Sequence, residues 1–228
     1  MFPFDRSQLP AANDFLTRLD GDWQAATGLT NRADYSIAYA PIAPCPLMVL
    51  GINPGGSADN FKLVDIASGS SEYIEGYGPT SQTMGQLLQL ALGTTSPEGI
   101  RGVQGSNVIW RRSPNLQSLG IKVPVAARET APHLARLIRH VSPRTILFGG
   151  RGAYDAYLDA HGGRQVEQGE TIMGPNGRSQ AVYFGHRVIS LPYLPERVEA
   201  FIVLHPSKGL RQVAVDRLRH HFSRLFGG

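Results

Sequence analysis

The sequence predicts an α/β protein, a fold in which a central parallel sheet lies between layers of helices. Short apolar runs alternate along the chain with stretches whose apolar residues recur at helical spacing, and this pattern is typical of such a sheet. Two of the apolar runs, 47–51 and 200–204, end abruptly in polar turn residues. Buried parallel strands end in this way where they deliver a loop at their carboxyl end. We therefore expect three α/β/α layers around a four-stranded parallel sheet.

The first half of the chain is expected to supply two strands and two helices. A short helix is predicted over 14–19, because its apolar residues share one face. The first strand is 47–51, and a long polar loop over 55–82 follows it. This loop leads into a helix at 83–93, which the glycine at its end terminates. The second strand is expected at 107–110.

The second half is expected to supply the remaining strands and three helices. Thr130 is predicted to cap a helix that has Pro132 in its first turn. The third and fourth strands are expected at 145–148 and 200–204. The helices of this half are expected at these ranges: 130–141, 153–160 and 213–225. The segment 162–198 is difficult to interpret, and a short hairpin is predicted within it from 181–184 and 187–190.

Length and composition restrict the class of protein. The chain of 228 residues suits a single domain spanning 1–228. Its single cysteine, Cys45, excludes an internal disulfide and any site that needs several cysteine ligands. No apolar run is long enough to cross a membrane, and the N-terminus lacks the pattern of a signal peptide. We therefore expect a cytoplasmic monomer without membrane contact, metal or cofactor. The net charge of +4 is compatible with nucleic acid as a partner.

Five segments resemble motifs of the uracil-DNA glycosylase superfamily, and they follow one another along the chain in the order in which the family has them. Residues 51–55, Gly-Ile-Asn-Pro-Gly, resemble its first motif in the version that carries asparagine, as in the mismatch-specific and single-strand-selective branches. Residues 205–207, His-Pro-Ser, resemble its second motif. Asn107 stands where the family places an asparagine that reads the base. Residues 78–83 resemble the loop that pinches the DNA backbone, and 146–150 resemble the third core strand.

The resemblance implies a monofunctional DNA glycosylase with this family's fold. Such an enzyme flips a damaged or modified base, here uracil or a 5-substituted pyrimidine, and hydrolyses its N-glycosidic bond. Asn53 would position the attacking water, and His205 would donate a hydrogen bond to the base oxygen as negative charge develops there. A neutral imidazole can act in this way. No lysine is expected in the crevice, so strand cleavage should not follow excision.

The resemblance also implies residues that hold the base. Asn107 would pair with the Watson–Crick edge through its amide, and Phe61 would stack on the ring. Tyr73 and Tyr77 lie in the same loop as alternatives to Phe61.

Two further residues of the first motif, Ile52 and Gly55, are also assigned to the base pocket. Gly55 has no side chain with which to exclude a 5-methyl group, so the pocket is open to larger 5-substituted bases. A role in defence against phages with modified DNA is one use of such a pocket.

Further residues are assigned to the DNA backbone and the gap left by the flipped base. They are Thr80, Ser81, Ser207, Lys208, Leu210 and Arg211. The three hydroxyl groups would bind phosphates and the two cations would add charge. Leu210 or Arg211 would be wedged into the gap left by the base. Arg111 and Arg112 are interpreted as surface charges, with contact to DNA as the alternative.

Other classes of protein stay open at this point. Asn53 has a structural alternative as a turn residue before Pro54, and His205 has one as a strand-end histidine. A catalytically silent nucleic-acid-binding module of the same fold is the main alternative to the enzyme. A nucleotide-binding protein that acts on small molecules is disfavoured, because 51–56 fits neither the P-loop nor the dinucleotide pattern. A metal hydrolase is disfavoured because the histidines lack ligand spacing.

Overall fold

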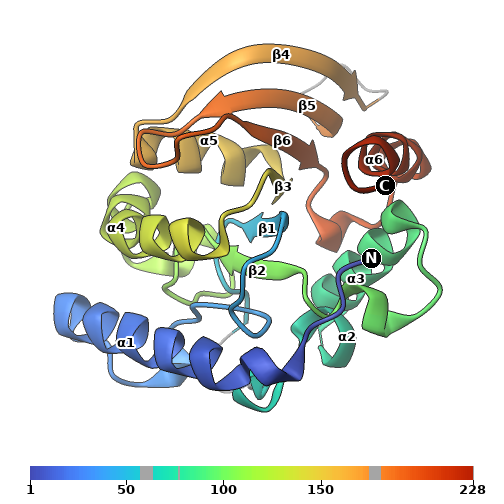
Figure 1. The fold of residues 1–228 in the computed structure, drawn as a ribbon. Helices are drawn as coiled ribbons and strands as arrows, with labels where there is room; N and C mark the ends of the chain where they lie inside the picture. Colours follow the sequence, from blue (N-terminus) through green and yellow to red (C-terminus); the bar gives the residue numbers. More distant parts are fainter. Residues whose placement is uncertain (57–63, 77, 175–180, 228) are drawn as a thin grey trace.

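A computed structural model describes residues 1–56, 64–76, 78–174 and 181–227, and it shows an α/β fold with a six-stranded sheet (Figure 1). The strands lie in the order β2-β1-β3-β6-β5-β4. Their bounds are β1 Leu47–Gly51, β2 Gln104–Asn107, β3 Thr145–Gly149, β4 Arg164–Met173, β5 Val182–Ser190 and β6 Val198–Val203. The predicted α/β class is therefore confirmed.

The sheet is mixed, so the prediction of a four-stranded parallel sheet is wrong for the sheet as a whole. Strands β2, β1, β3 and β6 are parallel neighbours, whereas β5 pairs with β6 in the antiparallel sense and β4 pairs likewise with β5. Of the two additional strands, β5 coincides with the segments for which a hairpin was predicted, and β4 was not predicted because it contains no apolar run. Most of its side chains are exposed, as is usual for an edge strand.

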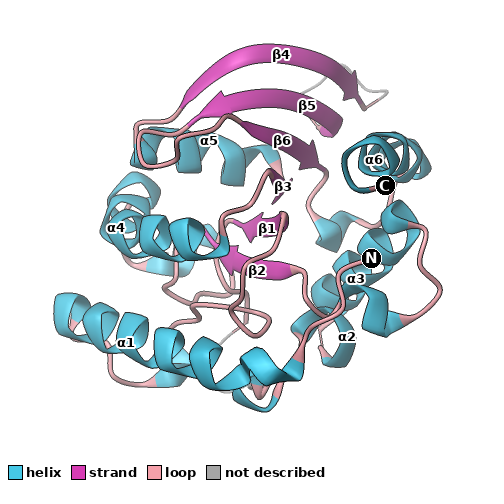
Figure 2. Ribbon diagram, in the orientation of Figure 1, coloured by secondary structure: helices cyan, strands magenta, loops and turns pink. Residues whose placement is uncertain are grey.

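Helices cover both faces of the sheet (Figure 2). Their bounds are α1 Leu9–Thr27, α2 Glu72–Glu75, α3 Pro79–Leu92, α4 Val123–Val141, α5 Arg151–His161 and α6 Gln212–Phe226. Helices α4 and α5 pack together on one face, and α1 packs against α4. Helices α3 and α6 pack together on the other face, with α2 beside α3. None of these helices is long and apolar enough to span a bilayer, a finding that covers the described part of the chain.

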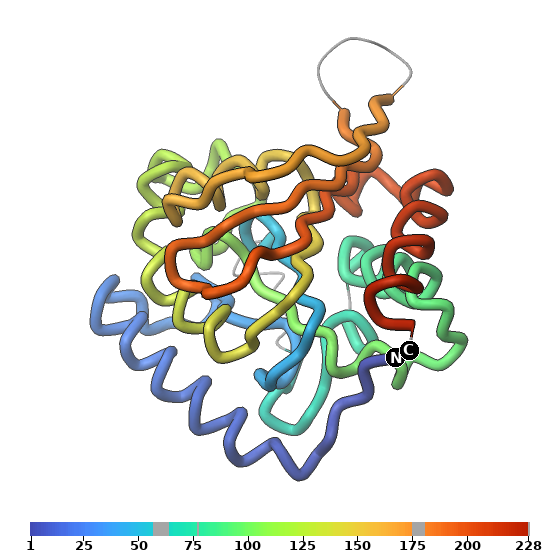
Figure 3. Tube along the Cα trace, turned by 45° about the horizontal axis from the view of Figure 1, so that its top comes forward, coloured from blue at the N-terminus to red at the C-terminus, as the bar shows by residue number. Residues whose placement is uncertain are grey.

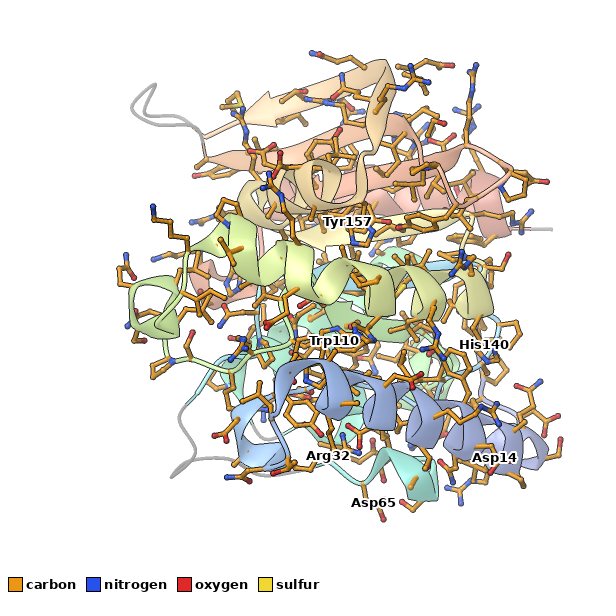
Figure 4. The ribbon with its side chains drawn as sticks, turned by 90° about the vertical axis from the view of Figure 1, so that its left-hand side faces the viewer. Asp14, Arg32, Asp65, Trp110, His140 and Tyr157 are labelled. Carbon is orange, nitrogen blue, oxygen red and sulfur yellow. The ribbon has the colours of Figure 1, made fainter. Side chains whose placement is uncertain are left out.

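Aromatic residues hold the peripheral elements on this framework. The rings of Trp23 on α1 and Trp110 after β2 lie 5.1 Å apart between centroids, and Figure 4 shows Trp110 between α1 and α4. The rings of Phe2 and Phe226 lie 5.0 Å apart. The two ends of the chain are therefore adjacent (Figure 3).

All five predicted helices begin earlier than the sequence predicted, and α1 extends well beyond both ends of the short helix predicted over 14–19. Helix α3 begins at Pro79, so Thr80 and Ser81 belong to its first turn rather than to the preceding loop. Helix α4 begins at Val123 and continues through Pro132. Thr130 is therefore not its cap; the buried hydroxyl of Thr130 donates to the carbonyl of Ala126 within the helix, at 3.0 Å.

Two strand predictions were wrong in position. Strand β2 ends at Asn107 instead of beginning there, because its polar residues are buried and bonded. Gln104 and Ser106 donate to the carbonyls of Pro41 and Ile37 at 2.7 and 2.5 Å. The hairpin predicted from 181–184 and 187–190 is a single strand, β5, whose Gly185 pairs with Ile202 in β6.

Candidate active site

The carboxyl ends of the four parallel strands open into one cavity of about 890 Å³. Gly51 at the end of β1, Asn107 at the end of β2 and Gly149 at the end of β3 line it, together with His205 just beyond β6. Ligands of open α/β sheets bind beside these strand ends. The structure therefore brings both sequence motifs to one cavity, although they are distant in the sequence.

Asn53 follows β1, and its side-chain amide has a fixed orientation. Its Nδ2 atom donates to the carbonyl oxygen and the hydroxyl of Ser113, at 3.2 and 3.0 Å, and to the carbonyl of Pro54 at 3.2 Å. Ser113 is itself buried and donates its hydroxyl to the carbonyl of Asn115 at 2.7 Å. Because Nδ2 carries these contacts, Oδ1 is the atom of this amide that is suited to orient a water molecule.

His205 follows β6 and has a defined tautomer. Its Nδ1 atom accepts a hydrogen bond from the backbone N–H of Ser207 at 3.3 Å and lies 2.8 Å from the hydroxyl of the same residue. A backbone N–H can only donate, so the proton of the neutral ring lies on Nε2. Burial, and secondarily the charge of Lys208, lowers the pKa of His205. The site therefore holds a neutral imidazole with one N–H donor.

Asn107 lies across from Gly51 in the parallel pairing of β2 with β1. Its side chain is almost fully buried, and its Nδ2 donates to the hydroxyl of Tyr39. A Cβ atom at Gly51 would overlap with Oδ1 of Asn107. The absence of a side chain at Gly51 therefore makes room for the Asn107 amide beside the cavity.

Replacing Gly51 with alanine is expected to destabilise the protein by about 1–3 kcal/mol, because the added methyl group displaces the Asn107 amide from its contact with Tyr39. Urea unfolding measures this change. Gly152→Ala on α5 is the control, since a Cβ there meets no atom within 4 Å, and we expect it to stabilise the helix by about 0.5–1 kcal/mol. If the Gly51→Ala variant were as stable as the wild type, this would contradict the close approach of Gly51 to Oδ1 of Asn107.

The cavity wall also contains residues that the sequence did not predict to belong to the site. Tyr39, Glu72 and Arg112 line the cavity, and Arg112 donates from Nη1 to the carbonyl of Gly55 at 2.5 Å. The interpretation of Arg112 as a surface charge was therefore wrong. Burial lowers the pKa of Arg112 and raises that of Glu72. Arg111, in contrast, is paired with Glu129 at 2.6 Å and does not line the cavity.

All three hydroxyl residues predicted to bind phosphates line the cavity, namely Thr80, Ser81 and Ser207. Thr80 and Ser207 are exposed. Ser81 donates its hydroxyl to Oε1 of Glu72 at 2.7 Å, so this hydroxyl already has an acceptor. Thr80 lies in the first turn of α3, where the positive end of the helix dipole favours anions.

Other predicted residues do not line the cavity. Leu210 is partly buried against the hydrophobic core, and Arg211 lies over the ring of Tyr183, 5.1 Å from its centroid. Ile52 is likewise packed against the core, and Lys208 is exposed in the short helix after His205. Leu210 therefore serves packing in this structure.

The proposed stacking residue Phe61 and its alternative Tyr77 lie outside the described residues. Tyr73, the other alternative, lines the cavity and is largely buried, with its ring edge-on to that of Tyr39 at 6.4 Å.

Within the described ranges, no group of three or more His, Cys, Asp or Glu side chains is arranged to hold a metal ion. No model of a known protein family matches this chain, and a search of curated proteins finds no significant relative. The geometry of the cavity and the sequence motifs are therefore the basis for a functional proposal.

Proposed function

We propose that this protein is a monofunctional DNA glycosylase, which flips a modified pyrimidine into the cavity and hydrolyses its N-glycosidic bond. The observation that carries the proposal is the meeting of Asn53 and His205 in one cavity with complementary atoms available. The same cavity thus holds an amide oxygen that can orient water and a neutral N–H that can donate to the departing base. Hydrolysis of this bond requires both, since the sugar becomes positive and the base negative.

The arrangement of the sheet and the rim of the cavity also support this proposal. Four parallel strands end at the cavity, and the resemblance to uracil-DNA glycosylases implies such strands. Thr80 at the start of α3 and Ser207 beside His205 present hydroxyl groups at the cavity. Hydroxyls and helix N-termini are common phosphate contacts in protein–DNA interfaces. We assign these two residues to the DNA backbone that flanks the flipped nucleotide.

The size of the cavity favours a substituted base. A volume of about 890 Å³ lies at the upper end of the range for pockets that hold drug-sized ligands, and a bare pyrimidine ring fills a small part of it. A Cβ at Gly55 would meet no atom within 4 Å. The first motif therefore leaves space beside the base, as a 5-substituent requires.

The test is excision from labelled single- and double-stranded oligonucleotides that carry uracil, thymine mismatches, 5-hydroxymethyluracil or glucosylated 5-hydroxymethylcytosine, with alkali to reveal abasic sites. We expect excision by the wild type and its loss in both Asn53→Ala and His205→Ala. No strand cleavage should occur before alkali. Tight DNA binding without release of any base would instead favour the alternative, a catalytically silent binding module.

Ser113→Ala is expected to slow excision about 3–10-fold, because it removes one hydrogen bond that orients Asn53, worth about 0.5–1.5 kcal/mol. Single-turnover rates measure the effect. Ser118→Ala is the matched control, since the Ser118 hydroxyl is exposed and bonds to Asn115 instead. Equal slowing in both variants would indicate a general disturbance of the loop and no orientation of Asn53 by Ser113.

A further inference from the structure

Glu72 is a carboxyl group in the cavity wall that the hydrolysis described above does not use. It is the first residue of α2 and lines the cavity together with Tyr39, Asn107 and Arg112. The hydroxyl of Ser81 donates to its Oε1 atom at 2.7 Å. This bond holds the carboxyl group in position at the cavity wall.

A carboxyl group at the edge of a base discriminates between amino and carbonyl substituents. It accepts a hydrogen bond from the exocyclic amine of cytosine. Against the corresponding carbonyl oxygen of a uracil-type base, an ionised carboxylate presents only lone pairs. Burial raises the pKa of Glu72, whereas the hydrogen bond from Ser81 and the charge of Arg112 oppose this shift and favour the ionised carboxylate.

The cavity also has room for a substituent on such a base. It continues from the strand ends to the segments 35–39 and 64–67, which both line it. Arg32 and Asp65, labelled in Figure 4, lie at this part of the cavity. Polar groups of this kind suit a polar substituent.

We infer that the base taken by this cavity is an aminopyrimidine, namely a cytosine with a polar 5-substituent, and that Glu72 receives its exocyclic amine. The inference rests on the proposed function for its biological meaning, but it concerns recognition and can be tested without turnover. It makes Glu72 a specificity-determining residue: an amide at this position offers a donor to a carbonyl-bearing base instead.

The test compares binding of two free nucleosides, 5-hydroxymethyl-2′-deoxycytidine and 5-hydroxymethyl-2′-deoxyuridine, to the full-length protein by nuclear magnetic resonance titration. They differ at the 4-position substituent and in the protonation of the adjacent ring nitrogen. We expect the wild type to bind the cytidine at least about tenfold more tightly. Glu72→Gln should abolish or reverse this preference. Glu167→Gln, an exposed carboxylate in an ion pair with Arg197, is the matched control and should retain it.

Equal or tighter binding of the uridine by the wild type would overturn the inference, and so would an unchanged preference in Glu72→Gln. Failure of the wild type to bind either nucleoside would overturn it as well. A thermal unfolding curve shows whether the Glu72→Gln variant folds. If it does not, the comparison of the two nucleosides on the wild type still tests the inference. Failure of the proposed glycosylase activity is seen separately, as the absence of abasic sites in oligonucleotides. Selective binding of the cytidine without excision would thus reject the enzyme and retain the recognition site.

Discussion

Replacing His205 with alanine is expected to lower the single-turnover rate of base excision by about 10²–10³-fold, the usual cost of removing one donor to a developing anion. The folded structure should persist, because His205 is only partly buried. Rates with saturating enzyme, measured by alkali cleavage of the product, test the expectation. His220→Ala on α6, whose ring lies outside the cavity, serves as the control. A loss below about threefold would exclude His205 as the donor to the leaving base.

The pH dependence of excision is a second test of the role of His205. The neutral form of His205 donates through Nε2, and its pKa is lowered by burial and by Lys208. Excision should therefore stay constant as the pH falls through 6.5, the usual pKa of histidine. It should decline only below the lowered pKa, where the proton taken up by Nδ1 breaks the bond from the backbone N–H of Ser207 and the ring loses its orientation. Lys208→Ala removes a positive charge and should move this decline to higher pH. A decline centred above pH 6.5 in the wild type would contradict the assignment.

The parts of the fold that the sequence could predict are those with a local signal. Strands β1 and β3 appear where their apolar runs predicted them, since most of their residues are apolar and buried. The loops that follow β1 and β6 were predicted from turn residues directly after such runs. Strand β2 was misplaced because its burial depends on carbonyl acceptors contributed by a distant segment, 37–41. Strand β4 depends on pairing with β5 and has no local signal.

The residues of the candidate site likewise divide into those with a local signal in the sequence and those without one. Asn53 and His205 could be found because each stands on a short motif, but Glu72 and Arg112 reach the cavity from separate loops and helices. A charged residue in a loop is ordinarily solvated, so nothing in the sequence distinguishes these two from surface charges. Leu210 is one of the two residues predicted to be wedged into the gap left by the base. In the structure it is partly buried against the core, and its contact with DNA stays a prediction.

Replacing Asn53 with aspartate is expected to slow excision at least about tenfold, although a carboxylate is the stronger base. The Nδ2 atom of Asn53 donates to the carbonyl oxygens of Pro54 and Ser113. An ionised aspartate would place an oxygen against these two acceptors. It could bond to the Ser113 hydroxyl only if that group, which accepts from Nδ2 and donates to the carbonyl of Asn115, turned to donate to the carboxylate. The carboxylate must then rotate or take up a proton, and either change misplaces the water. We expect a loss of stability of about 1–3 kcal/mol at pH 7.

The direction in which the stability of Asn53→Asp changes with pH shows whether the two carbonyl oxygens cause the destabilisation. The two carbonyl oxygens raise the folded-state pKa of this aspartate above its unfolded value of about 3.9. The destabilisation should therefore be absent below that unfolded value, where a protonated carboxyl donates as the amide did. It should grow as the pH rises between the two pKa values and be complete above the folded one. Urea unfolding between pH 3 and 8 measures this profile against the wild type.

Asn115→Asp is the matched control for this substitution. Asn115 lies at the same mouth of the cavity, and its side-chain oxygen accepts from the backbone N–H of Ser118 at 2.9 Å. An aspartate preserves that acceptor, so stability should change by less than about 0.5 kcal/mol. If Asn53→Asp were as active and as stable as the wild type, the side chain would not be held through Nδ2. The choice of asparagine over aspartate at position 53 is thus a consequence of the acceptors that surround it.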